Sequence, residues 1–465
     1  MKSKTIKPKK TNKKISIDAV WEPINLHAAG VDIGSREHWA CAPNQAGQTL
    51  VRKFGTFTAD LEAMAQWFKE CGITSVAMES TGIYWIALFQ ILERAGLEVI
   101  LVNARQTKNV AGRKSDVLDC QWIQRLHTYG LLQGSFRPED AYCVVRTYLR
   151  YRDELVAARA TQSQHMQQAL HQMNLQLTQV LSDVTGVSGL AIIKAILEGE
   201  RDGAKLAGLV DRRVRAGAAA FQQALRGDFR PEHLFVLEQA YELYGSYDAR
   251  IAACDERIAE VVAALPQKVN AKLIPPPPRK PGQPESRTQL GGQDLRLLLY
   301  ERFGVDLTAI EGIGVLTGLV VLTEVGPKLD RFKSEKHFCS WLGLCPDNRI
   351  SGGKVLSSRT RRVVNRVSTA LRMAACTLER SQSALGAFYR RMKGRLGAAE
   401  GITATAHKLA RILYRLIKHG EAYVRQGIDD YEKKFQDRKL KALKNMAQAL
   451  GLELVPKQTV SIEVS

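Results

Sequence analysis

The chain has 465 residues, of which 45% are hydrophobic, and its formal net charge is +20. This length predicts two or three domains with sizeable cores. No apolar run reaches the roughly 18 residues of a membrane span, and no apolar segment follows the Lys-rich start as a secretory signal requires. The eight cysteines form no C-x-x-C pair, which argues against a zinc knuckle and favours reduced thiols in a cytoplasm.

The positive charge is concentrated in two segments. Residues 1–14 hold seven Lys and no acid, and residues 328–395 hold sixteen Lys or Arg against four Asp or Glu. Charge gathered in this way predicts two phosphate-binding surfaces. Solubility is the alternative explanation. It suits the first segment, which we expect to be a disordered arm over residues 1–22, better than it suits the second.

The first globular region, residues 23–140, alternates short apolar runs with helical periods. The predicted order is β-β-β-α-β-α-β-α, an α/β domain in which sites form at the carboxyl ends of strands. Residues 44–47 have turn chemistry, so the second and third strands should form a hairpin. The predicted strands cover residues 27–32, 39–42, 49–54, 73–78 and 98–102, and the helices cover residues 58–70 and 84–95 and follow Asp116.

Four acids lie where such a sheet would gather them. Asp32 and Glu79 each end an apolar run, and Asp116 and Asp119 begin the last helix. Carboxylates from separate elements repel one another unless a cation lies between them, and hard cations such as Mg²⁺ take oxygen ligands. The last pair by itself has a plainer explanation, as acids in a first helical turn after an N-cap at Ser115.

The order of the elements and the positions of the acids resemble the ribonuclease-H-like fold of the RuvC resolvases. The resemblance implies a nuclease in which clustered acids hold Mg²⁺ or Mn²⁺ against a scissile phosphate. Sugar-kinase and Hsp70-type ATPases also carry an Asp-x-Gly after a strand, as at Asp32. They need a second lobe with its own Asp-x-Gly-x-x-Thr, however, and the sequence has none.

Three short sequence motifs narrow the resemblance to one family. They are Met78-Glu-Ser-Thr-Gly-Ile-Tyr-Trp85, Val102-Asn-Ala-Arg-Gln-Thr-Lys108 and Lys114-Ser-Asp-Val-Leu-Asp119. In these motifs the chain is similar to the DEDD transposases of insertion sequence family one hundred and ten. The resemblance implies that Asp32, Glu79, Asp116 and Asp119 are catalytic metal ligands. Members usually have Ala after the second Asp of the pair, where this chain has Cys120, a change that touches no ligand.

The middle region, residues 141–265, carries heptad patterns. Residues 141–180 contain no Pro or Gly, and from Pro231 onward apolar residues repeat every seven. Two long coiled-coil helices joined by a small helical insert are therefore predicted, as an antiparallel pair or a dimerisation arm. A monomeric helical hairpin is the alternative. The repeating positions are Leu237, Tyr244, Ile251, Ile258 and Leu265.

A Pro-rich linker over residues 266–294 is predicted to separate this region from the last domain. Seven of the fifteen prolines lie between positions 266 and 284, and such segments are extended and semi-rigid. Residues 295–430 are predicted as a mainly α domain, followed by a tail over residues 431–465. In it, Gly312-Ile-Gly314 predicts a helix-hairpin-helix whose tight turn presents backbone N–H groups to DNA phosphate.

The C-terminal domain resembles the second transposase domain of the same family, through residues 338–344, 349–354 and 403–408. This resemblance implies that Ser351 is a nucleophile that forms a phosphoserine link to DNA. The glycines after it should leave its hydroxyl approachable, and Arg349 and Lys354 could stabilise charge on the phosphate. Because no His lies nearby in the sequence, the expected activator is the metal held by the acids.

Ser351 has a plainer explanation as the cap of a turn, and Ser357 and Ser358 are rival hydroxyls. Arg359, Arg361, Arg362, Arg366 and Arg372 are predicted to follow on a helix. The candidate nucleic-acid ligands are turn glycines or cations: Gly312, Gly314, Arg349, Lys354, Arg359, Arg361, Arg362, Arg366, Arg390 and Arg391.

The leading hypothesis is a cytoplasmic, nucleoid-associated transposase that cuts and rejoins donor and target DNA. The resemblance implies guidance by a structured bridge RNA, and we expect a dimer or tetramer. A stand-alone RuvC-like Holliday-junction resolvase with a water nucleophile is one alternative, and a non-enzymatic nucleic-acid-binding protein is another. Mutation of Ser351 separates the first two, because a resolvase should survive it.

Overall fold

The computed structural model describes residues 22–80, 82–103, 116–272 and 288–453. The side chains of Asp116 and of residues 421–432, 434 and 435 lie outside the described part. So do residues 1–21 of the predicted arm and residues 273–287 of the predicted linker. The chain forms two compact units, Met1–Arg137 and Pro138–Ser465. In the described part, no helix is both long enough and apolar enough to cross a membrane.

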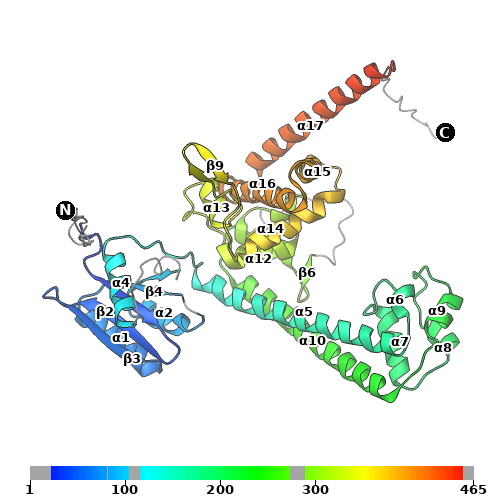
Figure 1. Ribbon diagram of the computed structural model, residues 1–465, viewed down its shortest axis with the longest axis horizontal. Helices are drawn as coiled ribbons and strands as arrows, with labels where there is room; N and C mark the ends of the chain where they lie inside the picture. The colour runs from blue at the N-terminus through cyan, green and yellow to red at the C-terminus, as the bar shows by residue number, and fades with distance from the viewer. Residues whose placement is uncertain (1–21, 81, 104–115, 273–287, 454–465) are drawn as a thin grey trace, which may run out of the picture. The chain divides into compact units, whose positions relative to one another are not determined.

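The first unit is built on a five-stranded mixed sheet in the order β3-β2-β1-β4-β5 (Figure 1). Strand β1 pairs antiparallel with β2 and parallel with β4, which is the ribonuclease-H-like arrangement expected from the sequence. The strands are β1 (Ala28–Ile33), β2 (Glu37–Pro43), β3 (Thr49–Gly55), β4 (Ser75–Glu79) and β5 (Glu98–Val102), and the helices are α1 (Thr58–Glu70), α2 (Trp85–Arg94) and α4 (Asp116–Thr128).

The two faces of this sheet are covered by different helices. Side chains alternate between the faces of a strand, and those of Val31 and Met78 join a buried core with Met64 of α1 and Leu88 of α2. On the other face, Gly30 lies under α4. A Cβ at Gly30 would lie 2.2 Å from the backbone N of Gln124, so only glycine allows the helix to pack this closely.

The second unit begins with two long helices, α5 (Asp140–Gln172) and α10 (Pro231–Ala264), which pack side by side (Figure 1). Arg152 pairs with Asp255 and Arg159 pairs with Asp248. The residue number rises along α5 from one pair to the next while it falls along α10, so the helices run antiparallel. This is one of the arrangements that the heptads allow. The heptad positions Leu237, Ile251, Ile258 and Leu265 are buried.

A small helical insert joins the far ends of these two helices. Its members α6 (Leu177–Val180), α7 (Val187–Leu197), α8 (Gly203–Ala207) and α9 (Ala218–Ala224) share a core with the adjoining turns of α5 and α10. At the other end, the buried Arg302 donates to the carbonyl oxygens of Val262 (3.0 Å) and Ala263, the last turn of α10. This arginine satisfies carbonyls that a helix end leaves unpaired.

The rest of the second unit is mainly helical, as the sequence predicts. A short hairpin of β6 (Gln289–Leu290) and β7 (Gln293–Asp294) lies at the end of the predicted linker. Much of the predicted tail is helix α17 (Glu421–Ala449), because residues 428–450 contain no Gly or Pro. The remaining elements are α11 (Leu295–Phe303), η3 (Leu307–Ala309), α12 (Val315–Val325), α13 (Glu335–Trp341), β8 (Arg349–Ser351), β9 (Lys354–Ser357), α14 (Arg366–Thr377), η4 (Leu378–Arg380), α15 (Ala384–Leu396) and α16 (Ala398–His419).

Candidate functional site

Asp32 and Glu79 lie on neighbouring strands at the same level. Strands β1 and β4 are parallel, and their register pairs Gly30 with Ala77 and Val31 with Met78. The next step of that register brings Asp32 opposite Glu79. Residues two apart share a face of the sheet, so Asp32 shares the face of Gly30, the face that α4 covers. Both acids are half-buried.

Helix α4 runs antiparallel to β1 and β4. Near its C-terminal end, Gln124 Nε2 donates to the Ala28 carbonyl over 3.3 Å, and His127 Nε2 lies 2.8 Å from Ser75 Oγ. The backbone N–H groups of Ile24 and Asn25 donate to the Thr128 carbonyl, at 2.8 and 2.9 Å. The end of α4 therefore lies at the start of both strands, and its beginning points toward their carboxyl ends.

The spacing along α4 brings the backbone of Asp116 to the level of Asp32. The carbonyl oxygen of Cys120 lies over Gly30, 2.5 Å from where a Cβ would be. From Cys120 to Asp116 the helix rises about 6 Å, and from Gly30 to Asp32 the strand advances about 7 Å. Asp119 follows on the same helix and is half-buried.

The described side chains do not by themselves make a metal site. Among the residues that the structure describes, no group of three or more His, Cys, Asp or Glu side chains is placed to hold a metal ion, and the side chain of Asp116 lies outside that part. The donor chemistry still fits a hard divalent cation, since carboxylate oxygens are its preferred ligands. The four-acid ligand set therefore stays a prediction.

The support under α4 includes buried polar contacts that the sequence did not reveal. Burial lowers the pKa of His127, and Glu98 partly opposes this change, so the ring favours its neutral form. A hydrogen bond with Cys120, together with burial, raises the pKa of the Cys41 thiol. In the sequence, Gly30 was the one sign that α4 packs closely on this face, because a glycine inside a strand often marks the close approach of another backbone.

Ser351 lies beside a two-residue turn in a β-hairpin. It pairs with Lys354 across the β8–β9 ribbon, and Gly352 (φ +55°) and Gly353 (φ +76°) form the turn. Positive φ at both central residues is the requirement of a type I′ turn, so the glycines serve the turn itself. Ser351 is exposed, and its hydroxyl forms no hydrogen bond to any residue in the described part of the chain.

The register sorts the hairpin into two faces. Paired residues share a face, so Ser351 and Lys354 lie together, with Arg349 on the same side two residues earlier. Ile350 and Val355, which pair with each other, lie on the opposite face. The rival Ser357 accepts a hydrogen bond from the backbone N–H of Arg359 over 3.4 Å, and Ser358 is exposed.

Several of the candidate cations have partners within the protein. Arg361 donates to the Ser340 carbonyl (2.9 Å), Arg366 pairs with Asp153 (2.5 Å), and Arg390 donates to the Glu379 and Ser381 carbonyls (2.9 and 2.5 Å). Arg391 lies over the Phe388 ring, 5.5 Å from its centroid. Each of these side chains thus has a structural contact. Arg349, Lys354, Arg359 and Arg362 are exposed on or just after the hairpin.

The helix predicted over residues 359–372 begins only at Arg366, so it contains Arg366 and Arg372. Its N-cap is Asn365, whose side chain accepts from the backbone N–H of Ser368. The three preceding arginines lie in extended chain instead, where the Asp347 N–H donates to the Arg359 carbonyl over 3.0 Å. The prediction for these three was wrong because the Asn cap, rather than the charge pattern, fixes the helix start.

Gly312 and Gly314 differ in their surroundings. Gly312 has φ +84°, and a Cβ there would lie 2.9 Å from the Ala374 carbonyl oxygen of α14, so helix packing explains this glycine. Gly314 is the exposed N-cap of α12. The element before this turn is the 3₁₀ helix η3 rather than an α-helix. Of the two glycines, only Gly314 thus lies at an exposed helix N-terminus, that of α12, where a phosphate could bind.

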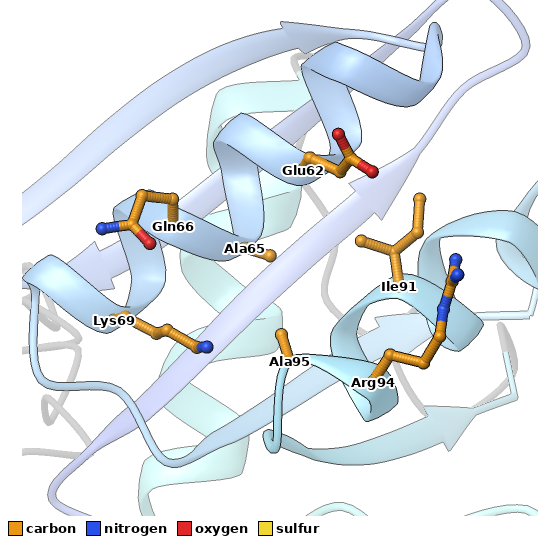
Figure 2. Close-up of a pocket in the computed structure, with 7 residues that line it drawn as sticks. All are labelled: Glu62, Ala65, Gln66, Lys69, Ile91, Arg94 and Ala95. Atoms are coloured by element: carbon orange, nitrogen blue, oxygen red, sulfur yellow. The ribbon is translucent and has the colours of Figure 1, made fainter.

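The cavity drawn in Figure 2 lies away from the acids. It has a volume of about 260 Å³ and lies between α1 and α2, the helices that pack on the face of the sheet opposite α4. Polar and charged side chains with long aliphatic stems make up much of its rim. The lining residues are Glu62, Ala65, Gln66, Lys69, Ile91, Arg94 and Ala95.

Two family models match the chain. A model of the IS110-type DEDD transposases, described as "Transposase", matches residues 29–175, which include all four acids. A model described as "Transposase IS116/IS110/IS902 family" matches residues 306–390, which include Ser351. No curated protein matches the chain. The DEDD class of nuclease implies a divalent metal. Two domain matches in the family's order, on a ribonuclease-H-like sheet, show that the chain belongs to the IS110 family of transposases, enzymes that cut and transfer DNA.

Proposed function

We propose that this transposase cuts and rejoins DNA with the carboxylates of Asp32, Glu79, Asp116 and Asp119 and the hydroxyl of Ser351. The observation that carries the proposal is the register of β1 and β4, which puts Asp32 level with Glu79 on the face under α4. Two carboxylates held side by side repel each other unless a cation is shared between them, and α4 begins at that same edge with the other two acids.

The acids would hold Mg²⁺ or Mn²⁺, both of which accept carboxylate oxygens. A divalent ion held there would supply charge stabilisation at the scissile phosphate and a lower pKa for an attacking hydroxyl. The phosphodiester would be oriented against the four carboxylates at this edge of the sheet. Asp32 and Glu79 come from two neighbouring strands, so the separation of their backbones is set by the sheet.

Ser351 would act as the nucleophile toward the phosphodiester. Its Oγ forms a bond to phosphorus, and the bond from phosphorus to the leaving sugar oxygen breaks. The hydroxyl proton passes to solvent, and the leaving sugar oxygen takes up a proton from solvent. Arg349 and Lys354 share the face of Ser351 and stabilise charge on the phosphate oxygens. A rejoining step reverses this transfer, when a sugar hydroxyl of the second strand displaces the serine.

The remaining parts of the proposal concern organisation. Residues 23–140 would supply the acids and residues 295–430 the serine, with residues 141–265 holding copies of the chain together in a dimer or tetramer. A structured bridge RNA would select donor and target DNA. The basic N-terminal segment, with seven Lys in residues 1–14, and the exposed cations of the β8–β9 hairpin support a polyanionic partner of this kind.

Trapping of covalent protein–DNA adducts tests the nucleophile. Ser351→Ala, Ser357→Ala and Ser358→Ala variants are incubated in parallel with cleavable DNA and a divalent metal. The adduct should vanish in Ser351→Ala and persist in the other two, which serve as matched hydroxyl controls from the last residue of the hairpin and the residue after it. An adduct that persists in Ser351→Ala, or that disappears in only one of the others, identifies a different nucleophile. Cleavage by Ser351→Ala without any adduct points to a water nucleophile and a resolvase.

A further inference from the structure

The β8–β9 hairpin exposes large apolar side chains on the side away from Ser351. Ile350 is 62% exposed, Val355 is 60% exposed and Leu356 is 69% exposed. Ile350 and Val355 form a cross-strand pair on that side, and the register slips between Arg349 and Ile350, so that Leu356 is the extra residue of β9, next to Val355 in the chain. Single exposed apolar residues are ordinary, but three together on one small ribbon mark an interaction surface.

This ribbon is held at its base and is uncovered at its tip. Strands β8 and β9 form a sheet of their own, and two-stranded ribbons are marginally stable alone in water. The base is anchored by the bond from Arg361 to the Ser340 carbonyl (2.9 Å) and by Gly343, where a Cβ would lie 2.2 Å from Val363 Cγ2. The fold therefore fixes where the apolar face emerges without burying it.

The charge around the apolar face selects a polyanion as its occupant. Residues 346–364 contain five Lys or Arg and one acid. Arg349, Lys354, Arg359 and Arg362 among them are exposed. A second copy of this hairpin would bring like charges together, whereas a nucleic-acid strand would neutralise them. Apolar side chains flanked by Arg and Lys are the pattern with which proteins enter a stack of DNA bases.

We propose that Ile350, Val355 and Leu356 form an apolar wedge that inserts among the bases of the DNA next to the phosphodiester facing Ser351. The opposite face of the same ribbon, with Arg349 and Lys354, holds the backbone while the wedge unstacks the neighbouring base step. Burial of the exposed apolar side chains against bases offsets the cost of unstacking. The inference rests on the proposed function only in that the polar face of the hairpin meets the DNA to be cut.

The experiment uses 2-aminopurine, whose fluorescence rises when it leaves the base stack. It is placed in turn at each position around the cut site in a duplex of the element's end. The full chain, with any RNA that co-purifies, carries Ser351→Ala so that the DNA stays intact. Fluorescence should rise at one or two adjacent positions. The rise should be lost in Ile350→Thr/Val355→Thr/Leu356→Thr, because threonine suits a strand but lacks the apolar bulk.

Val187→Thr is the matched control, since Val187 is 79% exposed on α7 and lies outside the hairpin. This control should keep the full fluorescence rise, and both proteins should melt as the parent does because all the changed residues are exposed. A rise that survives the triple substitution, or no rise at any position, overturns the wedge. A triple variant whose oligomeric size changes without DNA also overturns it, because the apolar face is then a protein interface.

The proposal for the wedge and the proposal for the nucleophile have distinguishable outcomes. If Ser351 forms no adduct in the parent chain but the local fluorescence rise depends on Ile350, Val355 and Leu356, the wedge is supported and the proposed nucleophile is wrong. If Ser351 forms the adduct while no base near the cut leaves the stack, the nucleophile is supported and the wedge is wrong.

Discussion

The carboxyl edge of the nuclease sheet and the β8–β9 hairpin are held by the fold to very different degrees. Asp32 lies between Val31 and Ile33, which are 0% and 4% exposed, whereas Ile350 beside Ser351 is 62% exposed. The acids are thus positioned by a packed core and by α4, and the serine by a turn and a narrow ribbon. Changes under the sheet should therefore affect both stability and chemistry, and changes on the hairpin should affect chemistry alone.

The largest effect is expected at Gly30. In Gly30→Val the side chain would meet the backbone of α4, 2.2 Å from the N of Gln124 and 2.5 Å from the O of Cys120. The helix must shift and carry Asp116 and Asp119 with it, at a cost of roughly 1–3 kcal/mol or more. Urea unfolding should show this loss, and DNA cleavage should be abolished. Gly245→Ala is the control, because nothing lies within 4 Å of its added Cβ.

Removal of one acid should separate chemistry from stability. Asp32→Asn keeps the shape of the side chain but removes a ligand charge, so cleavage should fall by at least about 100-fold. The melting temperature should stay the same or rise, because a like charge next to Glu79 is gone. Glu62→Gln, an exposed acid on α1, should leave both quantities unchanged. A large stability loss in Asp32→Asn would mean that the carboxylate is structural.

The hairpin cations should act on binding without affecting the fold. Arg359→Gln/Arg362→Gln removes two exposed charges, and the slope of log affinity against log salt should flatten by about 0.9 for each phosphate that the protein no longer neutralises. Arg361 is left in place because it anchors the ribbon to Ser340. Arg257→Gln, which breaks a pair with Glu260, is the control. An unchanged slope in the double variant would mean that the DNA-binding surface does not include Arg359 and Arg362.

The smallest effect concerns pH and the support of α4. Burial lowers the pKa of His127, while an unfolded His titrates near about 6.5. As pH falls below that value, the unfolded chain takes up the proton first, so stability is full above it and declines toward the folded pKa. His127→Gln, which can still bond to Ser75, should make this decline in unfolding free energy shallower. His165→Gln, on the exposed side of α5, should not change it.

The difference between the two regions also decides what the sequence could reveal. Strands β1 and β4 are buried apolar runs, each with an acid at its end, so their order and the level of Asp32 and Glu79 follow from pattern and topology. Strands β8 and β9 span three and four residues with exposed apolar side chains, and no periodicity marks them. Only the Gly352-Gly353 pair marks the turn, and in the sequence alone these glycines predict access to the Ser351 hydroxyl.

Tertiary partners explain the other omissions. Arg361, Arg366 and Arg390 look alike in the sequence as members of a basic segment. Their acceptors lie 21, 213 and 9 residues away, and nothing local in the sequence indicates these interactions. Gly312 likewise belongs to a Gly-x-Gly phrase that predicts phosphate binding, but the Ala374 carbonyl that requires it lies on α14. Interactions of this range depend on the packing of the whole domain.

The position of Mn²⁺ in crystals of the full chain, located by its anomalous scattering, tests most directly whether the four acids form one metal site. We predict a peak at the carboxyl ends of β1 and β4, with oxygens of Asp32 and Glu79 and of at least one of Asp116 and Asp119 within roughly 2–2.5 Å. That peak should disappear in Asp32→Asn crystals. A peak held by other residues, or Asp116 and Asp119 turned away from a site occupied by Asp32 and Glu79 alone, would contradict the four-acid site.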